Sequence, residues 1–86
     1  MSSRIAKLID PKIISIIELF LEREEELFHL QKVSKEAKVP LGSTFRLMKK
    51  IAGTGLVDII TVGKTKLYRT NKQVAKEFKA TGLVRK

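Results

Sequence analysis

The sequence lacks cysteine altogether and contains one histidine and two prolines among its 86 residues. Without cysteine the chain can form neither disulfides nor cysteine zinc sites, and His29 cannot hold a metal ion alone. Few prolines, five glycines and 43% apolar residues indicate a globular chain with a core to bury. We therefore expect one domain over residues 1–86, with no metal and no cofactor.

Long apolar runs are also missing. The longest, residues 13–17 and 19–21, fall far short of the roughly 18 residues that span a bilayer. The first twelve residues lack the apolar stretch and cleavage site of a secretory signal. These absences predict a cytoplasmic protein that makes no membrane contact.

Catalytic motifs are equally scarce. The sequence shows no carboxylate pair and no Ser–His arrangement, and Gly53-Thr54-Gly55 lacks the lysine and the spacing of a phosphate-binding loop. We expect no enzymatic activity.

Positive charge is what the sequence has in excess, with 18 basic and nine acidic side chains and a formal net charge of +9. Residues 1–31 carry four basic and six acidic side chains, whereas residues 32–86 carry 14 basic and three acidic. Such asymmetry is typical of polyanion binders, because each phosphate contacted releases condensed counterions. The alternative is a lysine-rich surface that serves solubility alone.

The first half of the chain predicts a helix over about 11–24, with Asp10 as its cap and Pro11 in its first turn. Apolar residues at spacings of three and four give it one wide buried stripe. The segment before it, residues 4–9, is either a further turn or an oligomerisation arm.

An acidic run, residues 22–26, follows this helix and is expected to be a solvated turn; alternatively it points away from DNA or meets basic side chains of a partner. Residues 27–30 form a strand-like patch, too short for a strand unless it pairs with something distant. Within this patch, His29 is expected to be a packed or half-exposed spacer.

Two further helices are expected over 32–38 and from about 41 or 42 to 52. The first stops at Val39-Pro40, since a residue before proline avoids the helical region. The second is expected to end at Gly53 and Gly55. Its buried face is predicted to hold Phe45, Leu47, Met48 and Ile51, and its outer face Ser43, Arg46, Lys49 and Lys50.

After Gly55 the pattern becomes β-branched and aromatic over 56–62 and 65–70. The two runs are separated by Gly63-Lys64, which suits a type II′ hairpin turn. A last helix is expected over about 72–80, capped by Thr70 or Asn71. The fold class is therefore mainly α with a small β-hairpin (α+β), and its core spans about 11–70.

Residues 33–57 resemble the helix-turn-helix of IclR-type and MarR-type transcriptional regulators. The resemblance lies in a small residue in the first motif helix, an apolar residue and proline in the turn, an S/T-x-x-R-L pattern, and a Gly-Leu-Val leading into the hairpin. The matching positions are Ala37, Val39, Pro40, Ser43, Arg46, Leu47 and Gly55-Leu56-Val57. The resemblance covers about residues 11–70 and implies a winged helix-turn-helix domain, with the hairpin as its wing.

That likeness implies sequence-selective binding of double-stranded DNA, with residues 41–52 in the major groove and the wing, 56–70, on the backbone or minor groove. The expected base and helix-terminus contacts are Leu41, Gly42, Ser43, Thr44 and Arg46, although Thr44 is better suited to bonding its own helix backbone. The expected phosphate or minor-groove contacts are Lys49, Lys50, Lys64, Lys66 and Arg69.

Two other functions stay open: a winged-helix module that binds protein within a larger transcription or chromosome assembly, and binding to RNA or to any duplex. Phe20 and Phe45 look committed to the core, which argues against RNA recognition by stacking. The resemblance also implies a homodimer, for which apolar residues of the terminal segments offer surface: Ile5, Leu8, Ile9, Val74, Phe78, Leu83 and Val84. Since no effector-binding domain follows in this sequence, we expect no small-molecule effector.

Overall fold

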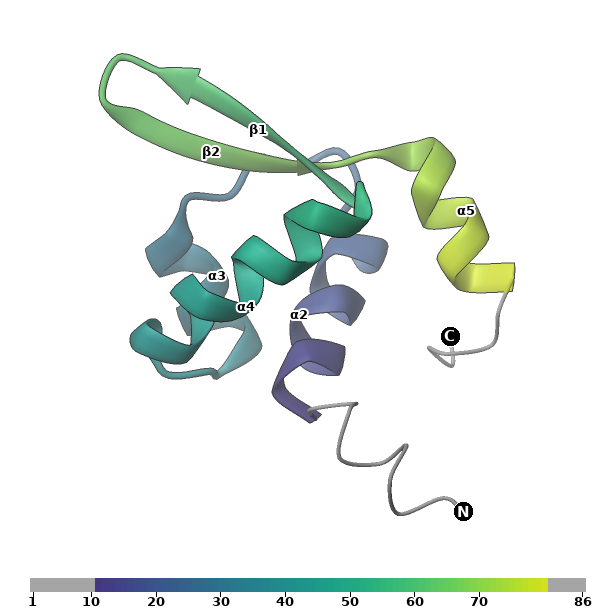
Figure 1. Ribbon diagram of the computed structural model, residues 1–86, viewed down its shortest axis with the longest axis horizontal. Coiled ribbons are helices and arrows are strands. Elements are labelled where there is room, and N and C mark those ends of the chain that lie inside the picture. The colour runs from purple at the N-terminus through teal and green to yellow at the C-terminus, as the bar shows by residue number, and fades with distance from the viewer. Residues whose placement is uncertain (1–10, 81–86) are drawn as a thin grey trace.

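The structure, a computed structural model, describes residues 11–80, and in that range three helices are followed by an antiparallel β-hairpin and a last helix (Figure 1). The elements are α2 (Pro11–Glu22), α3 (Leu30–Ala37), α4 (Leu41–Thr54), β1 (Val57–Val62), β2 (Thr65–Thr70) and α5 (Lys72–Ala80). This order confirms the expected mainly helical fold with one hairpin. Asp10 and residues 4–9 lie outside the described residues.

The core forms where α2, α3 and α4 pack together. Ile16 and Phe20 of α2 are completely buried, as is Val33 of α3, and they meet the inner side of α4. The stripe predicted for the first helix is confirmed, because apolar residues three and four apart share one side of a helix. The helix ends at Glu22, two residues earlier than expected.

Helix α3 begins at Leu30, two residues before the expected start, because His29 caps it. The backbone N–H of Lys32 donates to His29 Nδ1 at 3.2 Å, so the imidazole satisfies an amide that the helix leaves unpaired. His29 is therefore a helix cap rather than a spacer. At the other end Lys38 takes the left-handed conformation with φ 59°, and the helix stops before Pro40 as predicted.

The two glycines near the end of α4 differ in role. Gly55 follows the last helical residue with φ 88°, a conformation that glycine adopts without strain. Gly53 lies inside the helix, which continues to Thr54, so the prediction that both glycines end the helix is wrong for Gly53.

The β-hairpin pairs Val57 with Thr70 at its base and Val62 with Thr65 at its tip. Gly63 has φ 62° and Lys64 has no positive φ, as the expected type II′ turn requires. A third segment joins from far away in the sequence: Phe28 bridges Tyr68 in antiparallel fashion. The strand-like patch at 27–30, which is too short to form a strand alone, thus pairs with a distant segment of the chain.

The acidic turn after α2 is not simply solvated, because its carboxylates pair with lysines of the same chain. Glu24 binds Lys79 of α5 at 2.7 Å, and Glu25 binds Lys72 at the start of α5. The hydrogen bond and charge of Lys72 lower the pKa of Glu25. Helix α5 is therefore tied to this turn, and it lies at the opposite end of the molecule from the hairpin tip (Figure 1).

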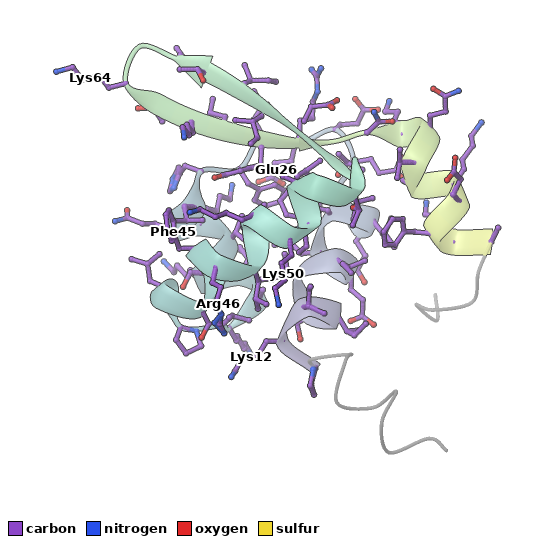
Figure 2. All side chains as sticks on the ribbon, in the orientation of Figure 1. Lys12, Glu26, Phe45, Arg46, Lys50 and Lys64 are labelled. Atoms are coloured by element: carbon purple, nitrogen blue, oxygen red, sulfur yellow. The ribbon has the colours of Figure 1, made fainter. Side chains whose placement is uncertain are left out.

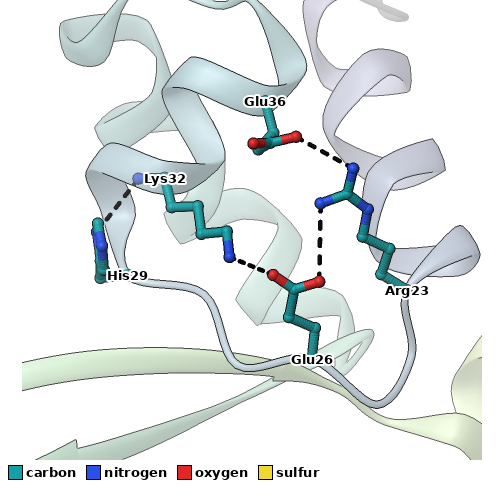
Figure 3. Close-up of polar contacts among 5 residues, drawn as sticks. All are labelled: Arg23, Glu26, His29, Lys32 and Glu36. Carbon is teal, nitrogen blue, oxygen red and sulfur yellow. Dashed lines mark hydrogen bonds and ion pairs between the residues drawn. The ribbon is translucent and has the colours of Figure 1, made fainter.

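The third glutamate, Glu26, links the turn after α2 to α3 (Figure 3). It pairs with Lys32, whose hydrogen bond lowers the pKa of Glu26, and it lies 3.7 Å from Arg23. Arg23 also contacts Glu36 of α3 at 3.1 Å. Glu24, Glu25 and Glu26 thus each pair with a cation of the same chain.

Helix α5 is capped by Asn71, whose Oδ1 accepts from the backbone N–H groups of Gln73 and Val74. Thr70, the other candidate cap, is buried and donates instead to the carbonyl of Phe20 at 2.7 Å. Val74 and Phe78 pack partly against the core, so less of their apolar surface is exposed than the sequence suggested.

Candidate nucleic-acid interface

Helix α4 has two contrasting sides. Leu47, Met48 and Ile51 face the core and are at most 2% exposed. Arg46, Lys49 and Lys50 are exposed on the outer side, where α4 carries no acidic residue. Arg46 and Lys50 are labelled on α4 in Figure 2. The segregation predicted for these six residues is confirmed, and it leaves a basic surface along the helix.

The start of α4 points backbone amides outward. Its first helical hydrogen bond runs from Thr44 N–H to the carbonyl of Pro40 at 2.8 Å, so the amides of Leu41, Gly42 and Ser43 precede helical bonding. Pro40 supplies no side-chain cap. Amides at such a position can bind an anion, helped by the helix dipole.

Thr44 does not belong to the exposed surface. Its side chain is 0% exposed, and its Oγ1 donates to the carbonyls of Val39 at 3.2 Å and Pro40 at 2.9 Å. The expectation that this hydroxyl bonds its own backbone is confirmed, and the buried side chain offers no surface for the DNA contact that was also predicted for Thr44.

Phe45 was expected in the core, but it is 53% exposed. The core side of α4 is already filled by Thr44, Leu47, Met48 and Ile51, which places Phe45 at the boundary. Its ring lies 4.6 Å from Lys49 Nζ, in a cation–π contact. The sequence does carry a sign of this position, because Leu41, Phe45 and Lys49 recur at intervals of four residues and so share one side of the helix.

A groove of about 700 Å³ separates α4 from the wing. Phe45 and Met48 line it from α4, Ile59 and Tyr68 line it from the strands, and basic residues stand around it: Lys49, Lys64 and Lys66. The structure therefore places residues of α4 and of the wing around one open, basic groove.

Arg69 is separated from this group. It pairs across the hairpin with Asp58, and its side chain lies on the opposite face of the hairpin from Lys66. Lys72 causes the larger lowering of the pKa of Glu25, and the charge of Arg69 adds a smaller one. Of the expected contacts on the wing, Lys64 and Lys66 adjoin the groove, and Arg69 belongs to the acidic side of the molecule.

Neither a metal site nor a membrane span is found in the described part of the chain. Within residues 11–80 no three potential metal ligands come together, and no helix there has the length and apolar character needed to cross a bilayer.

Solved structures similar to this chain share its winged helix-turn-helix fold. One is a candidate DNA-binding protein from Ralstonia eutropha JMP134, with a TM-score of 0.71 at 20% identity over 85% of this chain and 96% of the other. Another is the homodimeric winged helix-turn-helix DNA-binding domain Mb0332 from Mycobacterium bovis, with a TM-score of 0.69 at 18% identity over 94% and 74%.

A third similar structure is Sso10a-2, a DNA-binding protein from Sulfolobus solfataricus, with a TM-score of 0.60 at 15% identity over 85% of this chain and 81% of that protein. No protein-family model and no curated protein matches the sequence. The class that fold and geometry define is thus a winged helix-turn-helix domain, in which α3 and α4 form the motif and β1 and β2 the wing.

Proposed function

We propose that this protein is a transcriptional regulator that binds double-stranded DNA with sequence selectivity. The observation that carries the proposal is the outer face of α4, where Arg46, Lys49 and Lys50 are exposed beside a wing that adds Lys64 and Lys66. A helix that packs against the core on one side and carries exposed basic side chains on the other fits the major groove. The DNA-binding proteins with the same fold support this assignment.

Within this proposal the first half of α4 contacts base edges. Leu41, Gly42 and Ser43 approach the bases or a neighbouring phosphate, and Arg46 donates two hydrogen bonds to guanine. Lys49 and Lys50 contact phosphates on either side of the groove. Lys64, at the hairpin tip, reaches the backbone or minor groove with Lys66 behind it.

The distribution of acidic groups also supports this orientation. Glu24 and Glu25 are paired with Lys79 and Lys72 of α5, and Glu26 is paired with Lys32 of α3. Their charge is therefore largely compensated, and it does not oppose phosphates arriving at α4.

Selection from a random duplex library with the purified protein tests the proposal. Enrichment of a defined motif is the expected result, with affinity that falls on a log–log salt plot by about 0.9 per phosphate contacted. Arg46→Ala should then cost about 1–3 kcal/mol on the selected site and relax the preference for one base. Lys76→Ala, on the exposed side of α5, is the matched control and should bind as the parent does. Absence of enrichment together with weak, sequence-blind binding would refute selectivity.

We further propose that the protein acts as a homodimer. The Mb0332 domain with the same fold is homodimeric, and dimers of this kind present two recognition helices to half-sites about one duplex turn apart. The apolar residues expected to contribute, Ile5, Leu8, Ile9, Leu83 and Val84, lie outside the described residues. Analytical ultracentrifugation at micromolar concentration tests this, and a monomer there would contradict it.

A further inference from the structure

Two large apolar side chains stand on the outward side of α4. Leu41 is 45% exposed and Phe45 is 53% exposed. They are four residues apart and therefore neighbours along the helix surface. Apolar side chains gathered on an otherwise charged face mark a binding surface. A duplex contacted only through phosphates would not bury these side chains, whereas a base edge that carries an apolar group would.

We propose that Phe45 reads thymine by packing its ring against the C5-methyl group in the major groove, an inference that rests on the proposed DNA binding. The thymine methyl is the apolar group that base edges present in the major groove. Phe45 lies in the first half of α4, the half that contacts base edges in the proposed complex, and it precedes Arg46 in the sequence. Arg46 would select guanine at one position and Phe45 thymine at a neighbouring one.

The surroundings of the ring favour a polyanion over other partners. Phe45 lines the groove with Ile59, and the charges around that groove, from Lys49, Lys64 and Lys66, are all positive. Lys49 Nζ lies 4.6 Å from the ring centroid and occupies one ring face. Because Phe45 is 53% exposed, the rest of its ring stays accessible to a partner. Comparison of duplex and single-stranded DNA distinguishes contact with a methyl group from stacking by a base.

The test uses the duplex pool enriched by the selection described above, in two preparations. One is amplified with thymidine triphosphate and the other with deoxyuridine triphosphate. Uracil differs from thymine only by the missing methyl, so phosphate, minor-groove and guanine contacts are unchanged. The full-length protein should bind the uracil pool about fourfold more weakly, the factor expected when one methyl-sized group loses its burial. Phe45→Ala should bind both pools equally while keeping the salt dependence of the parent.

Two control variants make the assignment specific. Leu27→Ala removes a similarly exposed apolar side chain from the turn after α2, and it should keep the preference for thymine. Leu41→Ala removes the neighbour of Phe45 on α4, and it should keep most of that preference. Because all three side chains are at least 44% exposed, circular dichroism should show folded proteins.

Equal binding of both pools by the parent protein would overturn the inference while leaving DNA binding intact. Loss of the preference in Leu41→Ala but not in Phe45→Ala would also overturn it. So would a larger effect of Phe45→Ala on the same pool in single-stranded form, which would make Phe45 a stacking residue. Failure to bind either pool would refute the proposed function, and the inference with it.

Discussion

Phe28 and Tyr68 exchange two backbone hydrogen bonds, from Phe28 N to the Tyr68 carbonyl at 2.9 Å and from Tyr68 N to the Phe28 carbonyl at 2.7 Å. The Phe28 ring meets Phe20 edge to face, with centroids 5.1 Å apart. One residue thus joins the hairpin to α2, which orients the wing relative to α4.

Replacing Phe28 should destabilise the protein strongly. Phe28 is 0% exposed, so Phe28→Ala leaves a cavity in the core and should lower the free energy of unfolding by about 3–5 kcal/mol. Urea denaturation followed by circular dichroism measures this. The adjacent Leu27 is 44% exposed, and Leu27→Ala should change stability by no more than about 0.5 kcal/mol. Similar losses in the two variants would contradict burial of the Phe28 side chain as the source of the stability.

The two glycines at the end of α4 should respond to alanine in opposite directions. Gly55→Ala forces a side chain into φ 88° and should cost about 1–2 kcal/mol. Gly53→Ala meets nothing within 4 Å in a helical conformation and should stabilise by up to about 1 kcal/mol. Thermal unfolding of both variants distinguishes them, and a gain for Gly55→Ala would show that its left-handed conformation is not required.

The two faces of β2 should differ in DNA binding. Lys66→Ala removes a charge beside the groove, so it should weaken binding to every sequence and reduce the salt slope by about 1. Arg69→Ala removes the same charge from the face next to Glu25, and it should leave both quantities near their original values. Fluorescence anisotropy over a salt series measures them. Equal losses in both variants would mean that DNA contacts both faces of the hairpin, not only the face on the α4 side.

Acid should weaken the link between α3 and the turn after α2. Lys32 lowers the pKa of Glu26 below its usual 4.5 in the folded protein, so ionised Glu26 stabilises the fold above that value. This contribution is lost as pH falls through the lowered pKa. The thermal midpoint should therefore drop below about pH 4.5, and less steeply in Glu26→Gln. Parallel curves for parent and variant would exclude Glu26 as a contributor.

Much of the architecture was predictable from local patterns. Apolar spacing located α2 and the inner side of α4, and Gly63-Lys64 identified the hairpin turn. Asn71 was one of the two residues, with Thr70, that the sequence offered as the cap of the last helix, and it is the one that caps it. These features depend on residues close together in the sequence, where helical or strand periodicity and turn chemistry act directly.

Other features escaped that approach because they depend on distant partners. Phe45 was expected in the core, since spacing alone cannot tell a residue at the edge of a buried stripe from one at its centre. The acidic turn was expected to be solvated, since nothing in residues 22–26 reveals that Lys32, Lys72 and Lys79 arrive beside them.

The order of helices and strands, the buried stripes and the basic outer face of α4 were fixed by periodicity and charge, which each segment carries in its own residues. Only the tertiary structure determines which cations share a surface. Lys64 and Lys66 line the groove together with residues of α4, whereas the charge of Arg69 acts on Glu25. The reason is geometric, because neighbouring side chains of a strand point to opposite faces, and only packing determines what each face meets.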